Sequence, residues 1–162
     1  MRIAFYRGPG DWITRIIRVL TRGPYSHVEL VFSDGRRFSA SGRKPAGVRF
    51  SSEPHSEGWD FINLPVTAEQ ERAARTFAAV LEGSPFKWRG LFRFIAPFLG
   101  DGPNSHWYCS ELVLWMLQRC FGWFQNVPLK ISPNGLYRLC QNVPLKISPN
   151  GLYRLCVGIP LA

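Results

Sequence analysis

The residues Trp107–Phe121, WYCSELVLWMLQRCF, follow a polar loop at 100–105 and are apolar almost all round. A helix without a polar face belongs in the interior of a domain rather than on its surface. We therefore expect a buried central helix here, around which the other elements pack. Its first turn contains Cys109, and Cys120 follows three turns later, where we expect a thiol that is merely packed.

Cys109 is the residue of this helix that can carry chemistry. Free N–H groups and the helix dipole stabilise an anion at a helix N-terminus, which favours the reactive thiolate. The same N–H groups can hold the oxyanion that forms when a thiolate attacks a carbonyl group. A small cysteine packed at a helix start is the common alternative, so the case for catalysis also requires a histidine.

Three histidines could serve as the base, because a thiol hydrolase needs an imidazole to accept the thiol proton. His106 is close to Cys109 in sequence, but it lies in a polar loop with nothing evident to orient it. His55 lies in a run of turn-forming residues, where we expect a solvated side chain. His27 begins a predicted strand, and a strand end is a rigid mount for a base, so we favour His27.

The first 83 residues predict a small antiparallel sheet with two helices. Strands are expected over 2–6, 27–32, 37–41, 48–50 and 59–64, in the form of a meander. Asp11 can cap a helix over Trp12–Arg22, whose apolar stripe we expect to pack on the sheet. Thr67 and Gln70 form a capping box for a helix that ends near Glu82. An aromatic-rich helical stretch is expected at 88–95.

The turn Ser33–Gly35 decides which side chains share a face with His27. If Gly35 adopts the left-handed conformation in a three-residue loop, the register places Ser41 opposite His27 and Ser39 one pair along. Both serines then lie on the His27 face. A two-residue turn would direct them to the opposite face.

The bulk composition is that of a single globular domain. A chain of 162 residues with 46% hydrophobic residues can bury one sizeable core. The net charge of +9 attracts anionic surfaces nonspecifically, but no zinc-finger spacing, phosphate loop or basic run indicates specific nucleic-acid binding. The absence of a signal-peptide core and of a long apolar span leads us to expect a cytoplasmic protein.

The C-terminal end contains a perfect tandem duplication. Gln125–Cys140, QNVPLKISPNGLYRLC, is followed at once by the same sixteen residues, Gln141–Cys156. Solenoid repeats are longer, diverge and number at least three, so we interpret the second copy as one spare segment within a single 1–162 domain. Each copy predicts an extended segment, a Ser-Pro helix start and a short helix. Only one copy can occupy a single native site.

The order of several short motifs resembles the circularly permuted NlpC-type papain-like cysteine peptidases, the YaeF/YiiX-like group, including versions found in phages and prophages. The motifs are YSHVEL at 25–30, FSAS at 38–41 followed by Gly47-Val48, PFKW at 85–88, YCSE at 108–111 and the SPNGLY tail. This resemblance implies an α+β, permuted papain-like fold. Its antiparallel, meander-like or barrel-like sheet packs on the central helix that carries the cysteine.

By the same resemblance, His27 is the base and Cys109 the nucleophile. The third member of the family's site, a polar residue that orients the imidazole from the neighbouring strand, falls on Ser39. A serine departs from the usual acidic residue, because it cannot neutralise an imidazolium. Glu29 is a rival orienter, since residues i and i+2 share a strand face, although a solvated strand carboxylate is the simpler interpretation.

Four further residues are candidates for supporting or substrate-binding roles: Tyr25, Ser41, Tyr108 and Glu111. Glu111 most simply complements the positive end of the helix, with a positioning role as the alternative. Tyr108 could line the cleft beside the nucleophile or simply pack in the core.

The expected activity is hydrolysis of an amide bond, including those of cell-wall peptides, through a thioester, without cofactor or metal. One alternative is acyl-ester hydrolysis or acyl transfer on lipids, as in the lecithin-retinol acyltransferase group. In that case the basic amphipathic segment Trp12–Arg22 could contact an acidic membrane. Another alternative is an inactive phage structural or binding module, which the serine at position 39 would suit.

Overall fold

Helix α4 (Cys109–Phe121) occupies the centre of the protein, as its sequence predicts. The computed structural model describes residues 1–88 and 106–142. Most of α4 is buried, and the helix ends where Gly122 adopts the left-handed conformation at φ 69°. It begins two residues later than predicted, because Tyr108 is the extended N-cap residue. This boundary makes Cys109 the first helical residue.

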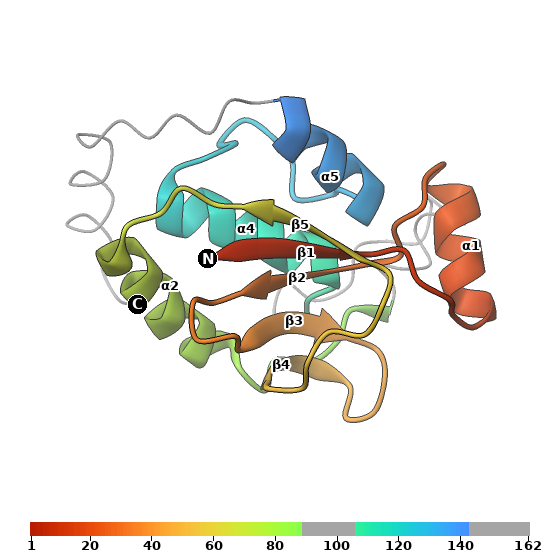
Figure 1. Ribbon diagram of the computed structural model, residues 1–162, viewed down its shortest axis with the longest axis horizontal. Helices are drawn as coiled ribbons and strands as arrows, with labels where there is room; N and C mark the ends of the chain where they lie inside the picture. The colour runs from red at the N-terminus through yellow and green to blue at the C-terminus, as the bar shows by residue number, and fades with distance from the viewer. Residues whose placement is uncertain (89–105, 143–162) are drawn as a thin grey trace.

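Five antiparallel strands form one sheet beside α4 (Figure 1). They are β1 (Arg2–Tyr6), β2 (His27–Val31), β3 (Arg37–Ser41), β4 (Gly47–Ser51) and β5 (Trp59–Asn63). All five predicted strands are confirmed, but the meander is wrong at its last step. The strand order is β4-β3-β2-β1-β5, so β5 pairs with β1 instead of β4. The connection after β4 returns the chain to β1, where the Gly58 carbonyl accepts hydrogen bonds from the N–H groups of Arg7 and Gly8.

The β2–β3 hairpin has the three-residue loop that places the two serines on the His27 side. Gly35 has φ 85°, and the Phe32 N–H donates to the Arg36 carbonyl at 2.9 Å. Leu30 therefore pairs with Phe38. Continued along the strands, this register sets Glu29 opposite Ser39 and His27 opposite Ser41.

The core lies between one face of the sheet and α4, with α2 (Ala68–Leu81) packed beside α4. Fully buried sheet residues on this face include Ile3, Phe5, Val28, Leu30, Phe38 and Ala40. The predicted capping box of α2 is confirmed, because Thr67 and Gln70 exchange hydrogen bonds of 2.7 and 3.2 Å. Because successive side chains of a strand point to opposite faces, the alternate residues of each strand lie on the other, more polar face of the sheet.

Helix α1 (Trp12–Leu20) begins at the predicted Asp11 cap, but its expected packing on the sheet is wrong. Figure 1 shows α1 beyond the end of the sheet rather than across its face. Its buried residue is Thr14, whereas the Trp12 side chain is 66% exposed. The inward side of the helix is mixed: Arg18 donates to the Gly8 carbonyl and to Ser26, while Ile13 and Ile17 line a pocket.

Helix α5 (Pro133–Asn142) comes almost entirely from the first copy of the duplicated sequence. Ser132 caps it by accepting a hydrogen bond from the Gly135 N–H at 3.0 Å, as the Ser-Pro start predicts. Leu136 and Cys140 of this helix are buried in the core. The remainder of the second copy, from residue 143, and the helix expected at 88–95, from residue 89, lie outside the described residues.

Asn134 attaches α5 to the segment that leads into β2. Its carboxamide oxygen accepts from the Tyr25 N–H at 2.9 Å, and its nitrogen donates to the Tyr25 carbonyl and to Thr21. A Cβ atom at Gly23 would lie 2.2 Å from the Asn134 carboxamide oxygen, so a glycine is required there. These contacts connect α5 to the backbone two residues before His27.

We expect Asn134→Ala to lower the free energy of unfolding by about 2–4 kcal/mol, because it leaves the buried polar groups of Tyr25 unpaired. Urea denaturation measures this change. The matched control is Asn150→Ala, the same substitution in the second copy, which should leave stability nearly unchanged. An equal loss in both variants would contradict the assignment of the docked helix to the first copy.

Candidate active site

Cys109 and His27, far apart in sequence, meet where the start of α4 reaches the end of β2. The Cys109 side chain lies close enough to the His27 ring to raise the pKa of the imidazole. Both residues line a pocket of about 460 Å³. Cys109 thus borders a space that a ligand could occupy, unlike a cysteine surrounded by core side chains on every side.

The residue that contacts the far side of the imidazole is Glu29. The His27 Nε2 atom lies 3.2 Å from Glu29 Oε1, so Nδ1 is the nitrogen left for the sulfur. The favoured third residue, Ser39, instead donates its hydroxyl to the same carboxylate oxygen at 3.2 Å. The contact with the imidazole that was expected of Ser39 is thus made by Glu29, and the interpretation of Glu29 as a solvated carboxylate is wrong, because its exposure is only 8%.

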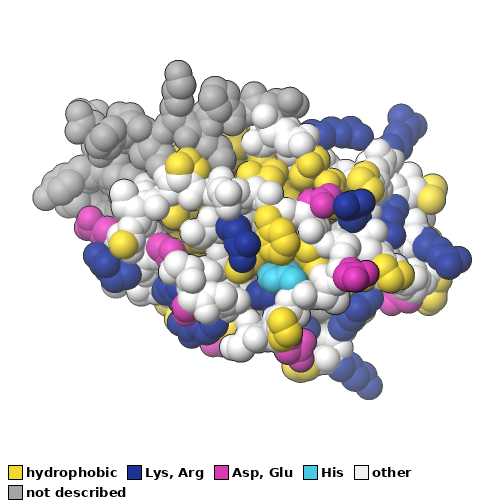
Figure 2. All heavy atoms as spheres, viewed as in Figure 1, with side chains coloured by type: hydrophobic (Ala, Val, Ile, Leu, Met, Phe, Trp, Pro, Cys, Tyr) yellow, Lys and Arg dark blue, Asp and Glu magenta, His cyan; other side chains and the backbone are white. Residues whose placement is uncertain are grey.

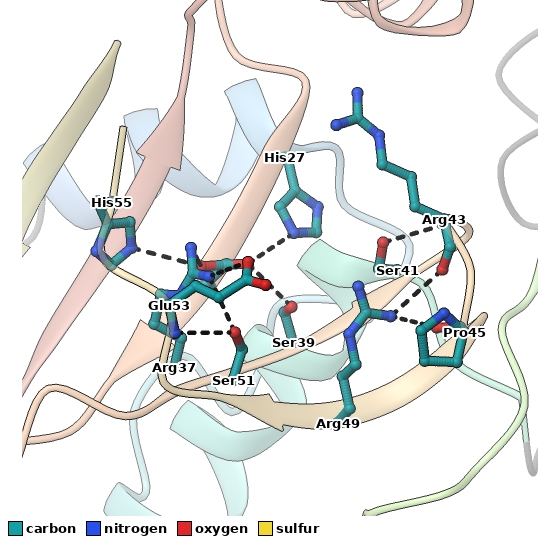
Figure 3. A network of polar contacts seen from close by, with 11 residues as sticks. His27, Arg37, Ser39, Ser41, Arg43, Pro45, Arg49, Ser51, Glu53 and His55 are labelled. Atoms are coloured by element: carbon teal, nitrogen blue, oxygen red, sulfur yellow. Dashed lines mark hydrogen bonds and ion pairs between the residues drawn. The ribbon is translucent and has the colours of Figure 1, made fainter. Parts of the chain in front are cut away.

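Two further cationic or ionisable groups face the second oxygen of Glu29. The Arg37 Nη1 atom lies 3.5 Å from Glu29 Oε2, and the His55 Nε2 atom lies 3.4 Å from it. Figure 3 shows His27, Arg37, Ser39 and His55 converging from different directions. Hydrogen bonds within the described residues therefore reach only Oε1 of the buried carboxylate, whereas Oε2 is stabilised by the nearby Arg37 and His55 side chains without a hydrogen bond.

His55 is the site residue that sequence reasoning missed. It was expected in solvent, but its side chain is only 14% exposed. Its ring packs edge-on against Trp59, with centroids 4.7 Å apart, and against Phe61 at 5.2 Å. The two aromatic residues at alternate positions of β5 were the available signal, because they form a wall on the Glu29 side of the sheet.

These contacts set the charge states of the pair. Burial alone would lower the pKa of His27, but the Cys109 thiolate and the Glu29 carboxylate outweigh it and raise the pKa from 6.5 to about 10. Burial alone would raise the pKa of Glu29, but the contact with His27, the nearby His55 and the charge of Arg37 hold it well below its usual range. The geometry thus favours an imidazolium beside an ionised Glu29 at neutral pH.

One wall of the pocket is attached to α4 by a buried ion pair. The Lys87 Nζ atom lies 2.7 Å from Glu111 Oε1, and both side chains are nearly buried. Phe86 and Trp88, on either side of Lys87, line the pocket. Glu111 lies in the first turn of α4, as expected. It therefore positions the pocket wall through Lys87 besides complementing the helix N-terminus.

The remaining predicted residues divide between the pocket and the core. Ser41 lines the pocket, and its hydroxyl accepts from the Arg43 N–H at 3.2 Å. Tyr108 is buried with its hydroxyl donating to the Ile131 carbonyl, so it packs rather than lining the pocket. Tyr25 is also buried, and its hydroxyl donates to Asp60 at 2.7 Å. Neither tyrosine is among the residues that line the pocket.

The arrangement of strands and helices can be compared with known structures. The fold resembles that of the metalloprotein YiiX from Escherichia coli O157:H7. The match has a TM-score of 0.54 and 17% sequence identity, and it covers 96% of this chain and 91% of the YiiX chain. No protein-family model and no curated protein sequence matches the chain. The likeness to YiiX supports the expected α+β fold, with its five-stranded antiparallel sheet.

A metal centre of the kind that the name of YiiX implies does not fit the described residues. Within residues 1–88 and 106–142, no group of three or more His, Cys, Asp or Glu side chains is arranged to hold a metal ion. The same part of the chain has no helix long and apolar enough to cross a lipid bilayer.

We expect Glu29→Gln, in a Cys109→Ala background that removes the thiolate, to lower the pKa of His27 by about 1 to 3, because the buried negative charge is lost. The imidazolium fraction at pH 8 should fall accordingly. Ser39→Ala in the same background should change the pKa much less, because it removes only a neutral donor. NMR titration of the His27 ring measures both, and equal effects would contradict the assignment of Glu29 as the orienting residue.

Proposed function

We propose that the protein is a cysteine hydrolase of the permuted papain-like type, in which Cys109 is the nucleophile, His27 the base and Glu29 the residue that orients the imidazole. The observation that carries this proposal is the Cys109–His27–Glu29 chain of contacts, which opens onto a pocket. The α+β fold of the chain and its structural likeness to YiiX are consistent with the permuted papain-like type. A nucleophile and base in contact, with the base oriented by a third group, is the arrangement of covalent hydrolases.

The proposed reaction cleaves an amide bond in two steps. His27 accepts the Cys109 thiol proton, and the thiolate attacks the carbonyl carbon to form a tetrahedral oxyanion. The N–H groups of the first turn of α4, which have no partner within the helix, stabilise that oxyanion. His27 then protonates the leaving amine, which departs as the thioester forms. In the second step His27 deprotonates water, which hydrolyses the thioester and releases the acid. Peptides, including those of cell walls, are the substrate class that the motif resemblance favours.

The contact between His27 and Cys109 predicts a histidine-dependent thiolate. At pH 6.5 the wild type should react with iodoacetamide at Cys109 at least about tenfold faster than His27→Ala, because the imidazolium stabilises the thiolate. Mass spectrometry of the alkylated peptide gives the rate, and Cys120 on the same helix serves as an internal control. Rates that are equal in the two proteins would support the inactive-module alternative.

A second candidate function, acyl-ester chemistry at a membrane, is favoured by the outer face of α1. Val19 is 75% exposed and Leu20 40% exposed, in addition to Trp12. Arg15 and Arg22 are also exposed and flank this face. Figure 2 shows Lys and Arg side chains gathered at the end of the molecule where α1 lies. An exposed apolar face flanked by cations is typical of helices that bind anionic lipid surfaces.

Arg15→Glu/Arg22→Glu should reduce pelleting with vesicles rich in phosphatidylglycerol at least about tenfold, because each basic residue near such a surface contributes about 1 kcal/mol. Arg18 is left unchanged, since its hydrogen bonds hold α1 in place. The control is Arg72→Glu on α2, an exposed charge away from this face. Unchanged binding of the double variant would contradict the membrane function and would not bear on the proposed amide hydrolysis.

A further inference from the structure

The polar face of the sheet continues from His27 to an arginine on the next strand but one. Ser39 of β3 pairs with Arg49 of β4, so the two side chains share a face. Ser39 in turn donates to Glu29 of β2. Because neighbouring strands lie about 4.8 Å apart, the backbone of Arg49 is roughly 10 Å from that of Glu29. The two residues line the same pocket as Cys109.

The Arg49 guanidinium is held in place without being neutralised. Its Nη1 atom donates to the main-chain carbonyls of Arg43 and Pro45 in the β3–β4 loop. Among the ion pairs of the described residues, none involves Arg49. A guanidinium that is fixed by carbonyl groups keeps its remaining N–H groups and its full charge for an anion. Figure 3 shows Arg43 and Arg49 on the side of the sheet where His27 and Ser41 lie.

The other arginines that line the pocket have carboxylates nearby. Arg37 contacts Glu29, Ser51 and Glu53. Arg43 lies 3.7 Å from Asp11, but both side chains are well exposed, so this pair is weak. The pocket therefore has a net positive end at Arg43 and Arg49. Ile13 and Ile17 of α1 add an apolar part to the lining of the same pocket.

We propose that Arg49, assisted by Arg43, binds an anionic group of the substrate while the acyl carbon lies at Cys109. This inference deepens the proposed function and rests on it: the substrate is an amide or ester that carries a carboxylate or a phosphate a short distance from the scissile bond. Arg49 is the specificity-determining residue, because a bidentate guanidinium distinguishes such oxyanions from neutral groups. The apolar part of the lining contacts the uncharged part of the same molecule.

Matched alkylating probes test this without a known substrate. N-iodoacetyl-β-alanine and its neutral amide differ only in charge, and N-iodoacetyl-O-phosphoethanolamine supplies the phosphate. Thiolate attack displaces iodide from each probe in the same way. In the wild type, one or both anionic probes should modify Cys109 about tenfold faster than the amide, because a charge-assisted hydrogen bond is gained. The faster of the two identifies the anion as a carboxylate or a phosphate.

Arg49→Gln should reduce the ratio of the anionic-probe rate to the amide rate to about one, and Arg49→Lys should retain part of the preference. Arg72→Gln is the control of equal net charge. An equal loss of preference in Arg49→Gln and Arg72→Gln, or no preference in the wild type, would overturn the inference. A His27→Ala variant that reacts with the amide like the wild type would instead overturn the proposed function, so the two failures are distinguishable.

If Cys109 reacts too slowly for rates to be compared, the change in melting temperature on adding unreactive analogues of the probes tests the same inference. N-acetyl-β-alanine or N-acetyl-O-phosphoethanolamine should stabilise the wild type and Arg72→Gln, but not Arg49→Gln, while the neutral N-acetyl-β-alaninamide should have a smaller effect on all three. Circular dichroism establishes that each variant is folded. Equal stabilisation of all three proteins by the anions would count against the Arg49 subsite.

Discussion

A carboxylate buried on β2 is the constraint around which the candidate site is built. An ionised carboxylate removed from water is destabilising unless charges and hydrogen-bond donors compensate it. Glu29 obtains that compensation from four side chains, two of which are imidazoles: His27, Arg37, Ser39 and His55. Removing one of these donors leaves the others to hold the charge, whereas removing Glu29 leaves several cations facing one another.

The same carboxylate explains why the imidazole is held in one orientation. Glu29 contacts Nε2 of His27, which leaves Nδ1 as the ring nitrogen available to Cys109. The register of the β2–β3 hairpin brings Ser39 beside Glu29, so a single glycine turn at Gly35 positions a donor for the carboxylate. Local turn geometry is thus transmitted through strand pairing to the geometry of the nucleophile and its base.

The sequence was sufficient for the features that depend on local chemistry. The capping box at Thr67 and the buried helix with Cys109 in its first turn each follow from a short pattern, whereas the turn at Gly35 was one of two alternatives that the sequence left open. The failures depend on contacts distant in sequence. The return of β5 to β1 and the burial of His55 both require the connection after β4 to cross the sheet, and no residue pattern within that segment specifies its path.

The roles of the individual basic residues likewise depend on contacts distant in sequence. The net charge of +9 predicts attraction to anions of any kind and does not say which cations are available to a ligand. Arg37 and Arg49 alternate with serines on adjacent strands and look alike in the sequence. The fold engages Arg37 with carboxylates, whereas Arg49 contacts only main-chain carbonyls within the described residues. The difference arises from strand order, which places β3 next to the buried Glu29 and β4 at the edge of the sheet, where its charge faces the pocket.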